Sequence, residues 1–107
     1  MKLEVGMCVR TLNGIVKIDK IQDNVMKDTK GYLHYGDFVK ASYNIIDILE
    51  IGDYVNGYPI YEIVEYEDDT RAIVIDDENK SIIWESEDIK SVITHEQMEQ
   101  MAFKVEE

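Results

Sequence analysis

The sequence predicts a mainly β protein made of two tandem small β-barrel modules and a short C-terminal α-helix. Three observations support this fold class: a repeated glycine-containing segment, short runs rich in Val, Ile and Tyr, and one strong helix-start signal. A chain of 107 residues forms one compact unit or two very small ones that share a core. We place the first module at 1–48, the second module at 49–93 and the helix, expected to pack on the second module, at 94–107.

A repeated pattern, E-[V/I]-G-x-[C/Y]-V, marks the start of each module. It occurs at residues 4–9 and again, 46 positions later, at residues 50–55. An Asn-Gly pair follows each copy, at 13–14 and at 56–57. This dipeptide is the strongest short-range hairpin signal, because both residues tolerate a positive φ. The common order favours a tandem duplication over two unrelated strands with similar turn chemistry.

Strand-like runs follow each Asn-Gly pair, at residues 15–21 and 60–64. Apolar and polar residues alternate in the first run, as in a half-buried strand, and β-branched residues dominate both. Short strands separated by turns at intervals of 8–12 residues are typical of small barrels or sandwiches. The opening strand, "VGMCVRT" followed by Asn-Gly, resembles the first strand of an SH3-like or Tudor-like barrel, so we expect this fold in each module.

Two helical segments are expected. Thr94 and Gln97 fit a capping box, in which the hydroxyl caps the helix and the side chain three residues later reaches back. The apolar stripe that should dock this helix on the second module consists of Met98, Met101 and Ala102. The segment 42–49, between the modules, favours a short helical turn, with a bridging strand left open as the alternative.

The charge of the chain is concentrated in its second half. Residues 1–50 contain seven acids and seven bases, whereas residues 51–107 contain sixteen acids and four bases, so the second part carries the whole net charge of −12. Such a protein should repel nucleic acid and anionic membranes, because binding phosphates requires clustered Lys and Arg. It could instead compete with nucleic acid for a basic groove, or the charge could serve solubility alone.

The sequence contains few residues suited to catalysis. The single cysteine, Cys8, lies among apolar strand residues and is expected to be packed, and no zinc-binding or phosphate-binding motif is present. The acidic run 76–79 is typical of a hairpin turn more than of a calcium loop. We therefore expect no enzyme activity, no cofactor and no metal site. The start of the chain has no secretion signal, and no apolar run is long enough to cross a bilayer, which predicts a soluble cytoplasmic protein.

Carboxylates of the second module are the candidate binding residues. Residues 65, 67 and 69 would share one face of a strand, as would residues 85 and 87, and rigid rows of carboxylates resemble a phosphate backbone. The predicted acidic face consists of Glu65, Glu67, Asp68, Asp69, Asp76, Asp77, Glu78, Glu85, Glu87 and Asp88. The aromatic anchors predicted beside it are Tyr58, Tyr66 and Trp84, which could equally be core residues.

Three segments carry a resemblance to a known family: "KLEVGMCVRT…NGIVKI", "KASYNIIDILEIGDYVNGY" and "DIKSVITHEQMEQM". Together they resemble small uncharacterised phage and prophage proteins of Gram-positive bacteria. His95 and Met98 stand where that family has Lys and Phe. The resemblance implies a mobile-element gene, a setting in which small acidic proteins often disable host defence, and it transfers no biochemical role to any residue.

These observations predict a non-enzymatic phage-type inhibitor of a host defence protein, an anti-CRISPR or another anti-defence protein, acting in the host bacterial cytoplasm. Its acidic face would bind a basic nucleic-acid site on that protein, without binding nucleic acid or membrane itself. One alternative is a binder that sequesters a signalling nucleotide between the modules, with Arg10, Lys40 or Arg71 reaching its phosphates. Another is a structural or virion-associated adaptor. Homodimer formation is left open.

Overall fold

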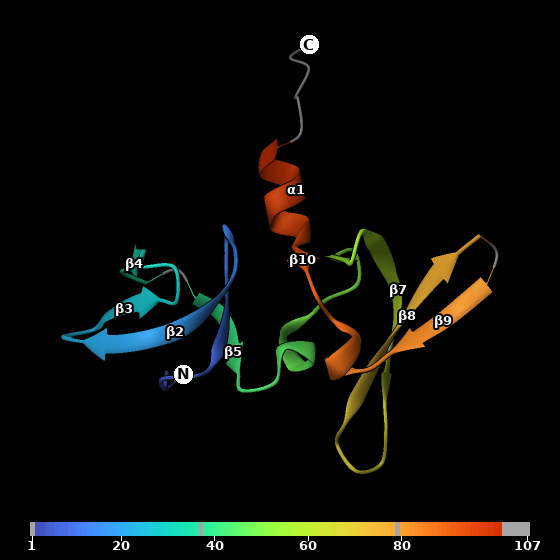
Figure 1. The fold of residues 1–107 in the computed structure, drawn as a ribbon, viewed down its shortest axis with the longest axis horizontal. Helices are drawn as coiled ribbons and strands as arrows, with labels where there is room; N and C mark the ends of the chain where they lie inside the picture. The colour runs from blue at the N-terminus through green and yellow to red at the C-terminus, as the bar shows by residue number, and fades with distance from the viewer. Residues whose placement is uncertain (1, 37, 79, 102–107) are drawn as a thin grey trace.

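The chain folds into two five-stranded antiparallel sheets and a short C-terminal helix (Figure 1). The computed structural model describes residues 2–36, 38–78 and 80–101. The mainly β fold class with one C-terminal helix is thus confirmed. The strands of the first sheet are β1 (Cys8–Thr11), β2 (Gly14–Gln22), β3 (Val25–Asp28), β4 (Leu33–His34) and β5 (Phe38–Ser42).

The second sheet repeats the strand order of the first. Its strands are β6 (Tyr54–Val55), β7 (Tyr58–Glu65), β8 (Arg71–Asp77), β9 (Lys80–Trp84) and β10 (Val92–Ile93). The first sheet is ordered β4-β3-β2-β1-β5, and the second, taken from β9 to β10, is ordered β9-β8-β7-β6-β10. In both sheets, therefore, the first strand of the module lies between its second and its fifth.

Backbone contacts of the two repeated segments match one for one. The amide of Gly6 donates to the carbonyl of Ile18 at 3.0 Å, and the amide of Gly52 donates to that of Ile60 at 3.3 Å. Directly after each of these isoleucines the strand register shifts, in β2 and in β7 respectively. An irregularity of this kind bends a strand and increases its twist. The long second strand of each module is therefore bent at the same point.

Barrel closure is not observed in either sheet. Among the described strands, no backbone pairing joins β4 to β5 or β9 to β10, so each sheet has two open edges. No helix within the described part of the chain is both long and apolar enough to cross a membrane.

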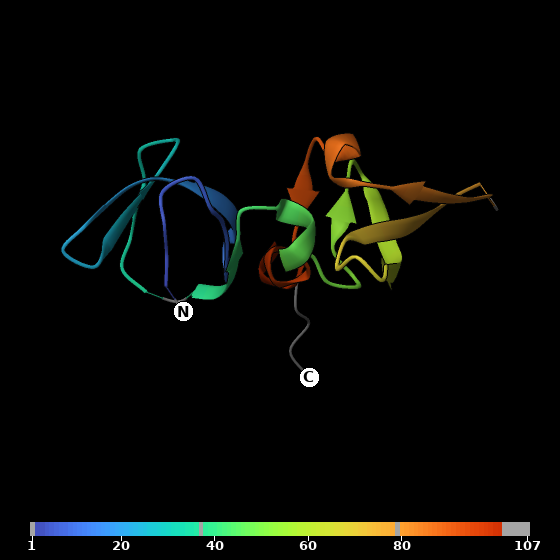
Figure 2. The same cartoon turned by 90° about the horizontal axis from the view of Figure 1, so that it is seen from below.

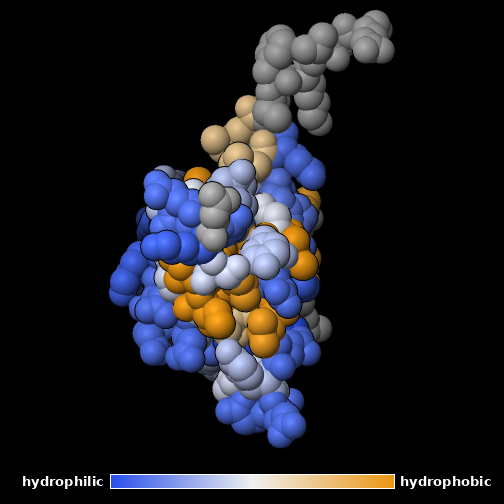
Figure 3. Space-filling model, turned by 90° about the vertical axis from the view of Figure 1, so that its right-hand side faces the viewer, coloured by the Kyte–Doolittle hydropathy of each residue, from blue (hydrophilic) through white to orange (hydrophobic). Residues whose placement is uncertain are grey.

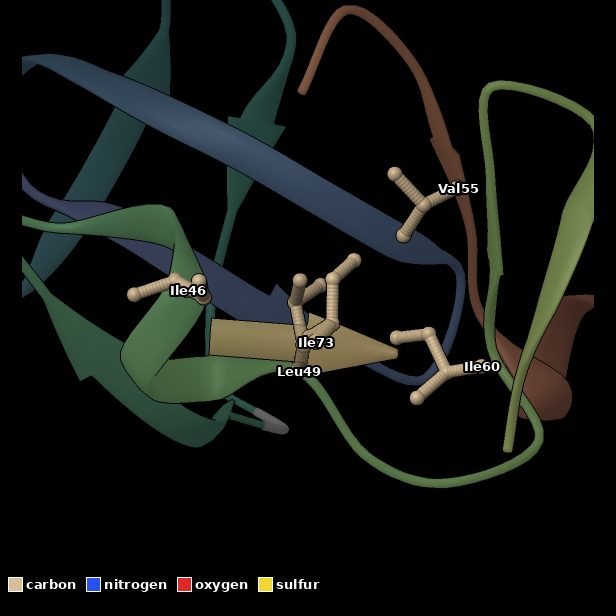
Figure 4. Close-up of a cluster of buried hydrophobic side chains, with 5 residues drawn as sticks. All are labelled: Ile46, Leu49, Val55, Ile60 and Ile73. Atoms are coloured by element: carbon tan, nitrogen blue, oxygen red, sulfur yellow. The ribbon is translucent and has the colours of Figure 1, made fainter. Parts of the chain in front are cut away.

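Each sheet covers its own apolar cluster. Val9, Ile18 and Met26 form the cluster of the first module. The larger cluster of the second module, drawn in Figure 4, contains Ile46, Leu49, Val55, Ile60 and Ile73. Side chains from outside the second sheet take part in this second cluster.

The segment between the modules packs against the second one. It forms a 3-10 helix, η1 (Ile45–Ile48), which confirms the helical turn expected at 42–49. Ile46 from η1 is buried in the second cluster, and Ile15 from β2 also packs against that cluster. The boundary drawn after residue 48 stays a prediction, but apolar contacts cross it.

The C-terminal helix, α1 (His95–Met101), lies between the two sheets, as does η1 (Figure 2). The predicted capping box is confirmed: Gln97 N donates to Thr94 Oγ1 at 3.2 Å, and Thr94 N donates to Gln97 Oε1 at 2.9 Å. The expected apolar docking stripe is wrong for its described members, because Met98 and Met101 are 38% and 73% exposed. Ala102 lies outside the described residues.

Candidate functional site

The acids expected along one strand lie largely in a turn. Strand β7 ends at Glu65, and the chain reverses so that Tyr66 N donates to the carbonyl of Thr70 at 2.9 Å. Asp68 Oδ1 accepts from the Thr70 hydroxyl at 2.6 Å, and Asp69 adopts a left-handed conformation with φ 65°. Asp side chains favour such local bonds over a strand ladder. The prediction that Glu65, Glu67 and Asp69 alternate along one strand face is therefore wrong.

The second row of acids does not form a strand face either. Strand β9 ends at Trp84, and residues Ser86–Asp88 form the 3-10 helix η2. The amide of Glu85 donates to Asp88 Oδ2 at 2.9 Å, which caps this turn. The prediction that Glu85 and Glu87 lie along one strand face is wrong, because local capping ends the strand first.

The turn after β7 and helix η2 nevertheless meet. They line one groove of about 350 Å³ together with Asn44, whose Oδ1 accepts from the Ser86 hydroxyl at 2.7 Å. Tyr66 and Arg71 also line this groove. The exposed acids of the two segments, here called the acidic end, are Glu67, Asp68, Asp69, Glu85, Glu87 and Asp88. The structure thus brings six of the ten predicted acids to one end of the second module.

The other four predicted acids do not belong to the acidic end. Glu65 lies beside it, at the end of β7, and forms an ion pair with Arg71 at 2.6 Å. Asp76, Asp77 and Glu78 lie at the hairpin between β8 and β9, as the turn prediction for this run required; its fourth residue, Asn79, lies outside the described residues. This hairpin is at the opposite end of the seven-residue strand β8 from Arg71, about 20 Å away at the usual rise per residue. The ten acids therefore form no single lattice.

The predicted aromatic anchors divide between core and surface. Trp84 packs against the apolar cluster of the second module, and its ring meets that of Tyr58 edge-on with centroids 5.9 Å apart. Tyr66 is 43% exposed and lines the groove at the acidic end. Figure 3 shows the outer side of the second module, where a hydrophobic patch is surrounded by hydrophilic residues. Of the three aromatics, Tyr66 is the one placed beside the acidic end.

A buried ion-pair cluster joins the two modules, and the sequence did not predict it. Arg10 of β1 and Asp53, just before β6, both have fully buried side chains. All five N–H groups of the guanidinium have an acceptor. Two go to the Asp53 carboxylate at 2.6 and 2.7 Å, two to Glu96 of α1 at 3.1 and 2.5 Å, and one to the carbonyl of Ile48 at 3.0 Å.

Three more contacts complete this cluster, here called the junction. His95 Nε2 lies 2.8 Å from Glu50 Oε1, Lys40 Nζ lies 2.9 Å from Glu50 Oε2, and the His95 amide donates to Asp53 at 2.9 Å. Ligand atoms of Glu50, His95 and Glu96 lie within 4.8 Å of one another, a spacing that could hold a metal ion. Both carboxylates are already paired with Arg10 or Lys40, so we assign these groups to ion pairing.

The junction shifts the pKa values of its members. Burial alone would raise the pKa of Glu50, but hydrogen bonds with His95 and Lys40 and the charge of Arg10 lower it to about 2. The hydrogen bond to Glu50 raises the pKa of His95, against the opposing effect of burial. Burial disfavours the charge on Arg10, yet its bonds to Asp53 and Glu96 hold its pKa above the ordinary value. The charged forms are thus mutually stabilised.

Of the three cations predicted to reach phosphates, one is buried and two line a groove. Arg10 is buried and saturated in the junction, so it does not face a ligand. Lys40 and Arg71 line one groove of about 550 Å³ beside the junction. The rest of its lining is Leu49, Glu50, Ile51, Ile63 and Glu65. Each of the two cations is paired with a glutamate of this same groove.

Chemistry-bearing residues outside these sites make local contacts. Cys8 is half-buried, and burial raises the pKa of its thiol, which opposes formation of the nucleophilic thiolate. His34 Nε2 lies 2.8 Å from Asp28, whose other oxygen accepts from the amides of Lys30 and Tyr32. This carboxylate therefore holds the loop between β3 and β4.

We compared the chain with known protein families, curated proteins and solved structures, and none of them matches. The proposals below are therefore supported by the residues and their geometry.

Proposed function

We propose that this protein is a non-enzymatic inhibitor whose acidic end docks on the basic, nucleic-acid-binding surface of another protein. The observation that carries the proposal is the convergence of the turn after β7 and helix η2, which together expose six carboxylates. Three of these, Asp68, Glu85 and Glu87, line one groove, and the other three are their neighbours in the two segments. Opposite charges across an interface speed encounter and select the partner. A Lys- and Arg-rich channel that normally holds phosphates has the required complementarity.

Local hydrogen bonds support this role, because they fix the backbone that carries the carboxylates. The side chain of Asp68 holds Thr70, and that of Asp88 holds the amide of Glu85. A binding surface that is already ordered loses less conformational entropy when it docks. Tyr66 adds an exposed aromatic ring of the kind enriched at interface hot spots. The acidic end therefore combines rigid charge with an anchor.

Each module is assigned, as part of this proposal, to the SH3-like or Tudor-like small barrels. The shared strand order and the bend at the same point of β2 and β7 support the assignment. The resemblance to phage and prophage proteins favours a host defence protein as the target. An anti-CRISPR or another anti-defence activity in the bacterial cytoplasm is the concrete form of this proposal.

Two variants with equal charge change test it. The first is Glu67→Gln/Asp69→Asn/Glu87→Gln at the acidic end. The second, Asp76→Asn/Asp77→Asn/Glu78→Gln, changes the hairpin at the far end of β8 by the same three charges. Tagged wild type and both variants are used as bait in nuclease-treated bacterial lysate at low and high salt.

We expect salt-sensitive capture of a nucleic-acid-binding protein by the wild type and by the hairpin variant, and at least a tenfold loss for the acidic-end variant. Capture that survives the acidic-end substitutions overturns the proposal. So does an equal loss for both variants, because it would indicate net charge without a localised site.

A second candidate function rests on the groove lined by Lys40 and Arg71. Its volume of about 550 Å³ lies within the usual range for small-molecule sites. Lys40 and Arg71, each in an ion pair, line this groove together with apolar Leu49 and Ile63, and they could hold an anionic nucleotide. Titration with a cyclic dinucleotide, followed by calorimetry at two temperatures, tests this alternative. Binding that is lost in Lys40→Met/Arg71→Met favours it, and absence of heat in the wild type at both temperatures contradicts it for that ligand.

A further inference from the structure

The charges of the junction balance only when its histidine is protonated. The junction contains three carboxylates and, apart from its histidine, two cations within its described contacts. A charged imidazole supplies the third positive charge. The carboxylates are Glu50, Asp53 and Glu96, the cations are Arg10 and Lys40, and the histidine is His95.

The parts that meet at the junction come from both modules and from α1. Arg10 and Lys40 belong to the first sheet, Glu50 and Asp53 to the segment that begins the second module. The helix contributes His95 and Glu96, and none of its described residues is buried. Polar contacts therefore hold α1 in place, including the bond from the Gln100 side chain to the carbonyl of Leu12 at 2.8 Å.

We propose that protonation of His95 controls how firmly the two modules and helix α1 are docked on one another. With the ring charged, the bond from His95 to Glu50 joins two opposite charges, whereas with the ring neutral the carboxylate is the only charged partner. When the ring loses its proton, the junction keeps one carboxylate charge in excess. Glu50, 28% exposed, is then paired mainly with Lys40, which is itself 45% exposed.

The groups that face His95 come from every element packed around it. Glu50 lies at 2.8 Å and Glu96 of its own helix at 3.6 Å from the ring nitrogens, and Asp53 accepts its backbone amide. The charge of Arg10 on β1 lowers the pKa of His95. Lys40 contacts Glu50, the carboxylate to which the ring is bound. The carboxylates outweigh Arg10, so they raise the pKa of His95 above its ordinary value of 6.5.

The direction of the pH effect follows from this. A histidine whose pKa is higher in the folded state contributes its full stabilisation below the unfolded-state pKa. That contribution is lost as the pH rises above 6.5 and through the higher folded value. Docking should therefore be firm in mildly acidic solution and looser in alkaline solution.

The experiment is an NMR titration of the full chain between pH 5.5 and 9, with 15N relaxation recorded at both ends of the range. We expect the ring of His95 to titrate above 6.5, and the amides of α1 and of residues 50–53 to shift with the same midpoint. Backbone order in α1 should fall on the alkaline side, as relaxation would detect.

The two histidines of the chain provide a matched pair of variants. His95→Gln retains a hydrogen-bond donor but cannot become charged, so the transition in α1 should disappear. His34→Gln changes the histidine bound to Asp28 and should leave that transition unchanged. If His95→Gln keeps the transition, or if the wild-type amides of α1 do not follow the His95 ring, the inference is wrong. The ring titration of the wild type remains decisive even if a variant does not fold, and no partner protein is involved.

Discussion

Arg10 and Asp53 face each other end-on, with two N–H···O contacts of 2.6 and 2.7 Å, across the boundary between the two modules. Both side chains are fully buried, although 43 positions separate them in the chain. A buried pair of this geometry holds its partners in a unique orientation only while both charges are present. We therefore expect the two modules to unfold together.

Removing one charge of this pair should be strongly destabilising. In Asp53→Asn, the guanidinium keeps Glu96 but loses its main counter-charge in a site without solvent, and such a change costs about 3–5 kcal/mol. Urea unfolding measures the loss. Asp76→Asn, which neutralises an exposed acid on β8, is the control and should change stability by less than about 0.5 kcal/mol. Equal stability of the two variants would contradict the role of the pair.

Acid should weaken the junction in a defined window. The pKa of Glu50 is depressed from 4.5 to about 2, so its ionised form stabilises the fold above pH 4.5. This contribution is lost as the pH falls from 4.5 toward 2. Unfolding midpoints recorded across that range should decline for the wild type, and the decline should be shallower in Glu50→Gln. Parallel curves for the two proteins would contradict this prediction.

Two isoleucines of the second sheet should differ sharply in their tolerance to truncation. Ile73 on β8 is fully buried in the cluster of the second module, whereas Ile83 on β9 is 57% exposed. Ile73→Ala should cost about 2–5 kcal/mol, because it removes apolar contacts and leaves a cavity. Ile83→Ala should cost less than about 1 kcal/mol by the same unfolding measurement. A reversed order would contradict the core assignment.

The glycines of the two Asn-Gly pairs provide a test of how α1 is held. Both have a positive φ, 120° at Gly14 and 89° at Gly57, so a Cβ strains either backbone. At Gly14 the added carbon would also lie 2.7 Å from the Gln97 side chain, whereas at Gly57 it meets no atom within 4 Å. We expect Gly14→Ala, and not Gly57→Ala, to speed hydrogen exchange of the α1 amides. Equal exchange in both variants would show that α1 does not rest on this turn.

The repeated glycine segment made two sheets of the same strand order predictable. Its pattern fixes similar turns before β1 and β6, and the capping residues Thr94 and Gln97 are local in sequence, so they could be recognised without the fold. The hairpin turn predicted from Asn-Gly is confirmed at 56–57, where these two residues form the turn between β6 and β7. At 13–14 the turn is displaced by one residue, and Gly14 begins β2.

The prediction of two acidic strand faces was wrong because aspartates close to strand ends prefer capping hydrogen bonds. The alternation of residues 65, 67 and 69 assumes an extended strand, but Asp68 stabilises a turn there. Likewise, Asp88 caps a turn where residues 85 and 87 were expected to be extended. The spacing of acidic residues in the sequence does not reveal either hydrogen bond. The predicted residues were nonetheless near each other, since two of these turns meet at the acidic end.

The junction was not predicted, although one difference between the two copies of the repeat is related to it. Asp53 occupies the position where the first copy has Met7, which packs against the first apolar cluster. A charged residue at an otherwise apolar position of a repeat indicates a buried partner. Identifying that partner as Arg10 requires the arrangement of the two modules, because no local pattern connects residues 10 and 53.

The separation of the two modules also separates a neutral part of the molecule from an acidic part. Residues 1–50 are neutral in sum, whereas residues 51–93, which contain the second sheet, carry twelve acids and three bases, and the two sheets lie side by side (Figure 1). A positively charged surface therefore exerts a torque on the protein before contact and turns the second module toward itself. Such orientation shortens the search during diffusion, and it weakens as added salt screens the field.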